Sequence, residues 1–192
     1  MRTSFPTRRA SVAIVVLASL VSAPQPVVAG GSSRYRTFSD GTWEVGDDIR
    51  ATTYRTRRAS ENCYWARLRN FRGGVDSIKA NDFTDGPAVV TIRPNDRGFE
   101  SSNCGTWTTD LSRITSSRTT FAKGTFIVGV DMRPGRYRNS SGRNCYWERL
   151  SNFTGTSDAI IANDFLDGTT IVEILDSDEG FSSSGCGTWR RR

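Results

Sequence analysis

The sequence predicts an all-β protein made of two tandem, homologous domains, each a small antiparallel β-sandwich or barrel with one disulfide. Three observations support this prediction: an internal repeat, four cysteines at matched separations, and short apolar runs divided by turn residues. No segment sustains the apolar periodicity of an amphipathic helix. The pattern therefore predicts two copies of one β folding unit.

The first 29 residues are typical of a secretory signal peptide. Arg2, Arg8 and Arg9 give a basic start, and Ala10 to Val21 form an apolar run that is too short to span a membrane. Small side chains place the cleavage after Ala29. The paired arginines leave twin-arginine export open beside the general secretory route. We expect a secreted, extracellular protein, either free or associated with the cell wall.

Export makes disulfides the expected state of the four cysteines. Cys63 and Cys104 lie as far apart in the chain as Cys145 and Cys186. Four cysteines allow three pairings, and the repeat favours Cys63 with Cys104 and Cys145 with Cys186. Each bridge would stabilise the folded state by about 4 kcal/mol through loop closure.

The internal repeat sets the expected organisation of the chain. Residues 38–107 align with residues 121–189 after a one-residue gap before Asn62 and Asn144, and more than half of the aligned positions are identical. The Ser/Thr-rich stretch between the copies predicts an exposed linker. The expected parts are a signal peptide (1–29), a flexible leader (30–37), a first β domain (38–107), a linker (108–120), a second β domain (121–189) and a basic tail (190–192).

Each copy is expected to hold six or seven short strands. Alternating residues predict strands at 42–45 and 125–128, each followed by a glycine turn, and further strands around Tyr54 and Tyr137. The most distinctive block is Cys-Tyr-Trp-x-Arg-Leu at 63–68 and 145–150. As a strand, it places Cys, Trp and Arg on one face, so that each disulfide packs near a tryptophan.

A hairpin is expected near the end of each copy. Asp85-Gly86 separates the apolar runs 78–83 and 89–93, and Asp-Gly recurs between the corresponding runs of the second copy. Asp-Gly between two apolar runs is a strong hairpin signal.

Repeated aromatic residues are candidates for the core or for a ligand platform. Core packing against the disulfides is the favoured interpretation for the tryptophans, which are Trp65, Trp107, Trp147 and Trp189. Tyr54 and Tyr137 follow turns and are the better surface candidates, because a phenol ring stacks on a sugar while its hydroxyl stays hydrated. The candidate ligand-binding residues are Tyr54, Tyr137, Trp65, Trp147, Arg67 and Arg149.

The repeated charged residues admit structural interpretations beside the functional ones. Three interpretations apply to Arg67 and Arg149. Each forms an ion pair, with Asp76 and Asp158 as suggested partners, or stacks on an indole, or recognises an anion. The acidic residues of the two Asn-Asp-Phe-x-Asp-Gly blocks suggest calcium binding, but turn-forming hydrogen bonds explain them more simply; they are Asp82, Asp85, Asp164 and Asp167. A further cluster is interpreted as unrepeated: Asp176, Asp178 and Glu179. We therefore expect no metal site and no cofactor.

Composition excludes several function classes. The chain has no histidine, which removes Ser-His-Asp and Cys-His nucleophilic systems and His-ligated metals. Removing the signal peptide halves the formal charge of +6, and neither repeat carries a basic excess. The remaining arginines at the linker and the C-terminus do not build a groove that tracks phosphates, so nucleic-acid binding is not expected. No catalytic signature is present, and we predict a protein that is not an enzyme.

The ordered motifs resemble a repeat of secreted and envelope-associated actinobacterial proteins. They are Gly-Thr-(Trp/Phe)-x-Val-Gly-x-Asp, Gly-x-Tyr-Arg, Cys-Tyr-Trp-x-Arg-Leu and Cys-Gly-Thr-Trp, and both copies contain all of them except the second. The first copy departs from the second motif, with Ala51-Thr52 where the second copy has Pro134-Gly135. This resemblance implies an envelope or extracellular location and supplies no catalytic residues.

Three functional hypotheses follow. The first is a non-enzymatic interaction module of the cell envelope, whose duplicated sites gain avidity on a wall polymer such as a glycan. The second is a double-headed inhibitor of secreted proteases, because disulfide-stabilised duplicated domains suit that role. The third, ranked last, is a glycosidase that uses two carboxylates. The expected partner is a cell-wall polymer or a secreted protein, and the sequence leaves the oligomeric state open.

Overall fold

The computed structural model describes residues 35–58, 60–140 and 142–192, and in these residues the chain is all-β. The helical elements within them are two short 3-10 turns, η1 (Val75–Ser77) and η2 (Ser157–Ala159). The predicted signal peptide lies outside the described residues. In the part of the chain that is described, no helix has the length and apolar character needed to cross a membrane.

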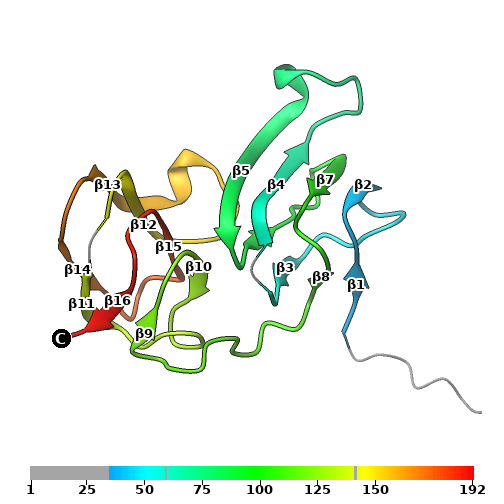
Figure 1. Cartoon of the computed structure of the whole chain (residues 1–192). Helices are drawn as coiled ribbons and strands as arrows, with labels where there is room; N and C mark the ends of the chain where they lie inside the picture. The colour runs from blue at the N-terminus through cyan, green and yellow to red at the C-terminus, as the bar shows by residue number, and fades with distance from the viewer. Residues whose placement is uncertain (1–34, 59, 141) are drawn as a thin grey trace, which may run out of the picture. The chain divides into compact units, whose positions relative to one another are not determined.

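Repeat 1 (residues 38–107) consists of two four-stranded antiparallel sheets (Figure 1). Its described strands are β1 (Thr37–Phe38), β2 (Gly41–Glu44), β3 (Thr53–Thr56), β4 (Ser60–Leu68), β5 (Ile78–Gly86), β6 (Val89–Thr91), β7 (Gly98–Ser102) and β8 (Trp107–Thr108). One sheet has the order β1-β8-β3-β6 and the other β2-β7-β4-β5. Side chains from both sheets form one core, which makes the repeat a β-sandwich.

Repeat 2 (residues 121–189) has the same topology, strand for strand. Its described strands are β9 (Thr120–Phe121), β10 (Gly124–Ile127), β11 (Gly135–Asn139), β12 (Cys145–Leu150), β13 (Ile160–Leu166), β14 (Ile171–Ile174), β15 (Gly180–Ser184) and β16 (Trp189–Arg191). The sheet orders are β9-β16-β11-β14 and β10-β15-β12-β13. The duplicated sequence therefore folds twice into one sandwich, with more strands per copy than expected.

The aromatic core is the same in both sandwiches. Phe99 stacks on Trp65 at 6.3 Å and meets Trp107 edge-on at 5.3 Å. In repeat 2, Phe181 makes these two contacts at the same centroid distances, with Trp147 and Trp189. Such aromatic pairs add to the burial energy of a small core.

The prediction of a hairpin at Asp-Gly is wrong. β5 pairs with β4, whereas β6 pairs with β3 in the opposite sheet, so the Asp85-Gly86 segment carries the chain from one sheet to the other. The Asp85 carboxylate accepts a hydrogen bond from the Asn62 amide at 2.8 Å, and Asp167 does the same for Asn144 at 2.9 Å. The aspartate therefore holds the start of the central strand instead of closing a hairpin.

The linker also differs from the exposed segment that the sequence suggested. Its carbonyls at Leu111 and Ser112 accept hydrogen bonds from the Arg55 guanidinium of repeat 1, and its Ile114 amide donates to Asp131 of repeat 2. Hydrogen bonds to both repeats fix this segment in place.

The expected flexible leader and the expected basic tail both contain strand residues. At the leader, Arg36 exchanges two hydrogen bonds with Thr109, each 3.0 Å long, and Thr37 already belongs to β1. At the predicted basic tail, Arg190 and Arg191 belong to β16 and pair with β11. The sandwich therefore extends beyond the bounds that alignment of the copies suggested.

Candidate functional site

The predicted disulfides are confirmed, one in each repeat. Cys63 is bonded to Cys104 and Cys145 to Cys186. All four cysteines are buried within the two aromatic cores. They are structural groups, as expected for an exported protein.

The tryptophans divide into a fully buried pair and a pair that differs between the copies. Trp107 and Trp189 are fully buried, and their indole N–H groups donate to Ser101 and Ser183. Trp65 is also buried, whereas its counterpart Trp147 is only partly buried.

The exposed tyrosine platform is contradicted by the burial of both rings. Tyr54 is 1% exposed and Tyr137 is fully buried, each in the core of its sandwich. Their hydroxyl groups donate to the carbonyls of Arg50 and Arg133 at 3.1 and 2.7 Å, and burial raises the pKa of both phenols. The rings stabilise the core and offer no face to a sugar.

Arg67 and Arg149 form ion pairs, as one interpretation predicted, but with other partners. Each makes two hydrogen bonds to one carboxylate, Arg67 to Asp96 and Arg149 to Asp178. The suggested partners Asp76 and Asp158 lie instead in the 3-10 turns. Asp178 is the equivalent of Asp96, so this one member of the acidic cluster has the same role in both copies.

Repeat 1 uses its arginine for one additional contact. The third Arg67 nitrogen donates to the Thr154 carbonyl of repeat 2 at 2.6 Å. Burial alone would raise the pKa of Asp96, but hydrogen bonds from Arg67, the Arg93 amide and Lys79 outweigh burial and hold that pKa below its ordinary value. The arginine and aspartate are therefore structural ions, and one of these pairs also joins the repeats.

An ion pair that joins the two repeats is entirely buried. Arg55 of repeat 1 donates to the carboxylate of Asp131 in repeat 2 at 2.9 and 3.3 Å, and neither side chain is exposed. Beside it, apolar side chains of both repeats form a small core, here called the inter-repeat cluster: Val89, Ile127, Leu150 and Phe153. The two sandwiches thus share a packed contact within residues 33–192, which form one compact unit.

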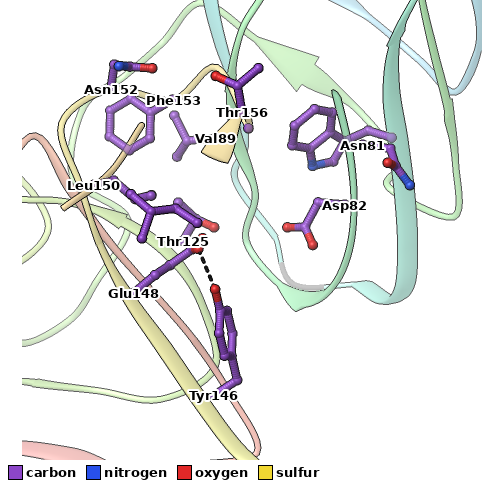
Figure 2. Close-up of a pocket in the computed structure, with 13 residues that line it drawn as sticks. Asn81, Asp82, Val89, Thr125, Tyr146, Glu148, Leu150, Asn152, Phe153 and Thr156 are labelled. Carbon is purple, nitrogen blue, oxygen red and sulfur yellow. Dashed lines mark hydrogen bonds between the residues drawn. The ribbon is translucent and has the colours of Figure 1, made fainter. Parts of the chain in front are cut away.

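A pocket of about 160 Å³ opens along this contact, here called the inter-repeat pocket. Repeat 1 contributes Trp65, Asn81, Asp82 and Val89, and the other lining residues come from repeat 2. Figure 2 shows the carboxyl groups of Asp82 and Glu148 directed into this pocket from its two walls. The Tyr146 hydroxyl donates to Glu148 at 2.9 Å.

Both pocket carboxyl groups are held toward their protonated forms. Burial raises the pKa of Asp82, and burial together with the nearby charge of Asp82 raises that of Glu148, although the Tyr146 hydroxyl opposes the shift. Burial and Glu148 raise the pKa of Tyr146 to about 12. Among the described residues that line the pocket, none is a lysine or an arginine.

The sequence pointed to Asp82 and Trp65 but missed Glu148 and Tyr146 as site residues. The predicted site residues are shared by the two copies, whereas Glu148 stands where repeat 1 has Ala66. This difference between the copies is the sequence signal that points to Glu148 as a site residue. Among the described residues, no group of three or more His, Cys, Asp or Glu could hold a metal ion.

Comparison with known families matches the chain twice. The model of the Rv1352-like extracellular domain matches residues 36–108 and again residues 118–190. No curated protein matches the chain, and no solved structure matches it.

Proposed function

Since the chain belongs to the Rv1352-like extracellular domain family, we propose that it is a secreted, non-enzymatic interaction module whose two repeats build one ligand site, the inter-repeat pocket. Secretion, the tandem repeat and the disulfides are established. The observation that supports the site is the meeting of Asp82 and Glu148 across a pocket to which each repeat contributes one carboxyl group.

The chemistry of the pocket suits one end group of a cell-envelope glycan. Carboxyl oxygens accept hydrogen bonds from sugar hydroxyls, and the partly buried Tyr146 ring offers an apolar face. Pockets for drug-sized ligands occupy about 300–1,000 Å³. At about 160 Å³, this pocket accommodates a single terminal group of a polymer.

The test is co-sedimentation of the secreted protein with purified cell walls and insoluble polysaccharides, at low and high salt. We expect binding that persists at high salt and falls at least about tenfold in Glu148→Gln and Asp82→Asn, a change of about 1.4 kcal/mol. The matched control is Asp164→Asn, because Asp164 is the exposed equivalent of Asp82 outside the pocket. Equal loss in the control, or no sedimentation at any salt, would reject the proposal.

A carboxylate-only glycosidase is the second candidate, favoured by the raised pKa of both pocket acids. Release of reducing sugar from wall fragments that is abolished by Glu148→Gln would establish it over simple binding. The double-headed inhibitor receives less support, because the two Asp-Gly loops are not equally accessible. Gly86 is buried against the backbone of Lys123, whereas Gly168 faces open space.

A further inference from the structure

The contact between the repeats joins two different surfaces. Repeat 1 contributes what we call the docking edge, which consists of Arg55, Trp65, Arg67 and Gly86–Val89. Repeat 2 contributes what we call the receiving face, which consists of Thr125, Asp131, Leu150 and Phe153–Gly155. Three backbone acceptors connect them: the Thr125 amide donates to Pro87 and the Thr91 amide to Phe153, both at 2.7 Å, and Arg67 donates to Thr154.

Because the repeats are homologous, each carries the surface that the other uses. Repeat 2 has an unused docking edge made of Arg138, Trp147, Arg149 and Gly168–Ile171. Repeat 1 has an unused receiving face made of Thr42, Asp48, Leu68 and Phe71–Gly73. A contact between unlike surfaces leaves one of each free, and such contacts join further copies head to tail.

Two large apolar residues of the unused surfaces are exposed where their counterparts are buried. Ile171 is 48% exposed against 4% for Val89, and Phe71 is 48% exposed against 8% for Phe153. Among the described residues, the buried indole nitrogen of Trp147 has no hydrogen-bond partner.

Glycines on the two surfaces show the same difference. A Cβ atom at Gly155 would lie 2.3 Å from the Trp65 ring, and one at Gly86 would lie 2.5 Å from the Lys123 carbonyl. At the equivalent positions, Gly73 and Gly168, a Cβ atom would meet nothing within 4 Å. The space that Trp65 fills beside repeat 2 is therefore open beside repeat 1.

The unused receiving face is also hollowed. A pocket of about 420 Å³ is lined by Thr42, Leu68, Phe71, Gly73 and Ile78, which are equivalents of residues that line the inter-repeat pocket. At its rim, exposed Arg72 occupies the position of Thr154, and on the unused docking edge exposed Glu173 occupies the position of Thr91. Because the Thr91 amide donates to Phe153, next to Thr154, a contact of the same geometry between copies would place these opposite charges near each other.

We propose that the docking edge of repeat 2 binds the receiving face of repeat 1 in a second copy of this chain. Glu44 stands where Ile127 completes the inter-repeat cluster and is paired with Arg97. The contact between copies thus buries less apolar surface than the internal one and is correspondingly weaker. This proposal is independent of what the inter-repeat pocket binds.

Sedimentation velocity of the secreted protein over a wide concentration range tests this proposal. We expect reversible growth in mass with concentration, and Ile171→Asp should weaken association by at least about tenfold. The control is Phe165→Asp, because Phe165 is exposed and its equivalent Phe83 stays exposed beside the internal contact. A protein that is monomeric at every concentration, or equal weakening in the control, would overturn the proposal.

Two further variants test the head-to-tail geometry. Arg72→Glu should also weaken association, and adding Glu173→Arg to the same chain should restore it. Mixing Ile171→Asp with Arg72→Glu should give a 1:1 heterodimer that grows no further, because one intact edge then meets one intact face. Failure of the charge exchange to restore association, or a mixture that stays monomeric, would contradict this arrangement.

Discussion

The two repeats share the same topology and the same core arrangement, but equivalent surfaces are covered in one repeat and exposed in the other. The disulfide, the aromatic cluster and the arginine-aspartate pair recur with nearly the same geometry. The docking edge of repeat 1 is covered by repeat 2, whereas the same edge of repeat 2 is open. The duplication therefore yields one asymmetric body, in which each repeat contributes what the other leaves unused.

The largest difference between equivalent residues is expected at Arg55 and Arg138. Arg55→Ala leaves the buried Asp131 carboxylate without its partner, which costs about 3–5 kcal/mol of unfolding free energy. Arg138 is exposed, and Arg138→Ala should change stability by no more than about 0.5 kcal/mol. Urea unfolding measures both variants, and similar losses in the two would mean that the repeats do not depend on their contact.

The paired arginines of the central strands should differ by a smaller amount. Both Arg67→Ala and Arg149→Ala remove a two-bond ion pair from a buried aspartate. Asp96 keeps Lys79 and the Arg93 amide as partners, and Asp178 keeps the Leu175 amide. Only Arg67 also donates to Thr154 of the other repeat, and a hydrogen bond from a charged group contributes about 1.5–3 kcal/mol. Urea unfolding should show Arg67→Ala to be the more destabilised, by up to about that amount, because Lys79 still pairs with Asp96. The reverse order would remove this contact from the account.

Two glycines isolate the packing of Trp65 from backbone strain. Gly155 and Gly73 have positive φ angles of 70° and 77°, so a side chain at either position carries a similar backbone penalty. Gly155→Ala adds a collision with Trp65, and overpacking of this kind costs about 1–3 kcal/mol. Thermal unfolding of the two variants should differ by that amount, and equal midpoints would show that Trp65 is not seated there.

The smallest effect is expected from the pocket carboxyl groups, through pH. The raised pKa values of Asp82 and Glu148 mean that the folded state holds their protons more tightly than the unfolded state, so they lower stability as pH rises through those values. Asp82→Asn and Glu148→Gln should each gain roughly 0.5–2 kcal/mol at neutral pH.

This gain should disappear at acidic pH, where the native carboxyl groups are protonated in both states. Asp96 has the opposite sign, because its pKa is lowered and its contribution is lost as pH falls through the folded value. Urea unfolding across pH distinguishes the two cases, and a gain that does not depend on pH would contradict the assignment of the pocket acids.

The features that the sequence predicted correctly are those that lie within one repeat and recur in the other. Both disulfides, the inward face of the Cys-Tyr-Trp strand and the all-β class follow from periodicity and spacing. The Asp-Gly segments led to a wrong prediction of strand pairing. The same turn residues occur in hairpins and in crossovers between sheets. Local propensity does not specify which strand an apolar run will join.

Most of the site could not be predicted from the sequence, for a physical reason. Its walls come from two copies, and the residues that matter are those in which the copies differ, such as Glu148 against Ala66. Tyr54 and Tyr137 are shared by the copies because both rings are buried in the cores. Shared residues report on the fold of one repeat, whereas differences report on the contact between repeats.

The most direct test of the central claim is differential scanning calorimetry of the secreted protein with both disulfides intact. Because the repeats share a buried ion pair and an apolar cluster, the account predicts one transition, with equal calorimetric and van't Hoff enthalpies for residues 33–192 as a unit. Two separable transitions, or a calorimetric enthalpy about twice the van't Hoff value, would mean that the repeats unfold independently and would contradict the account.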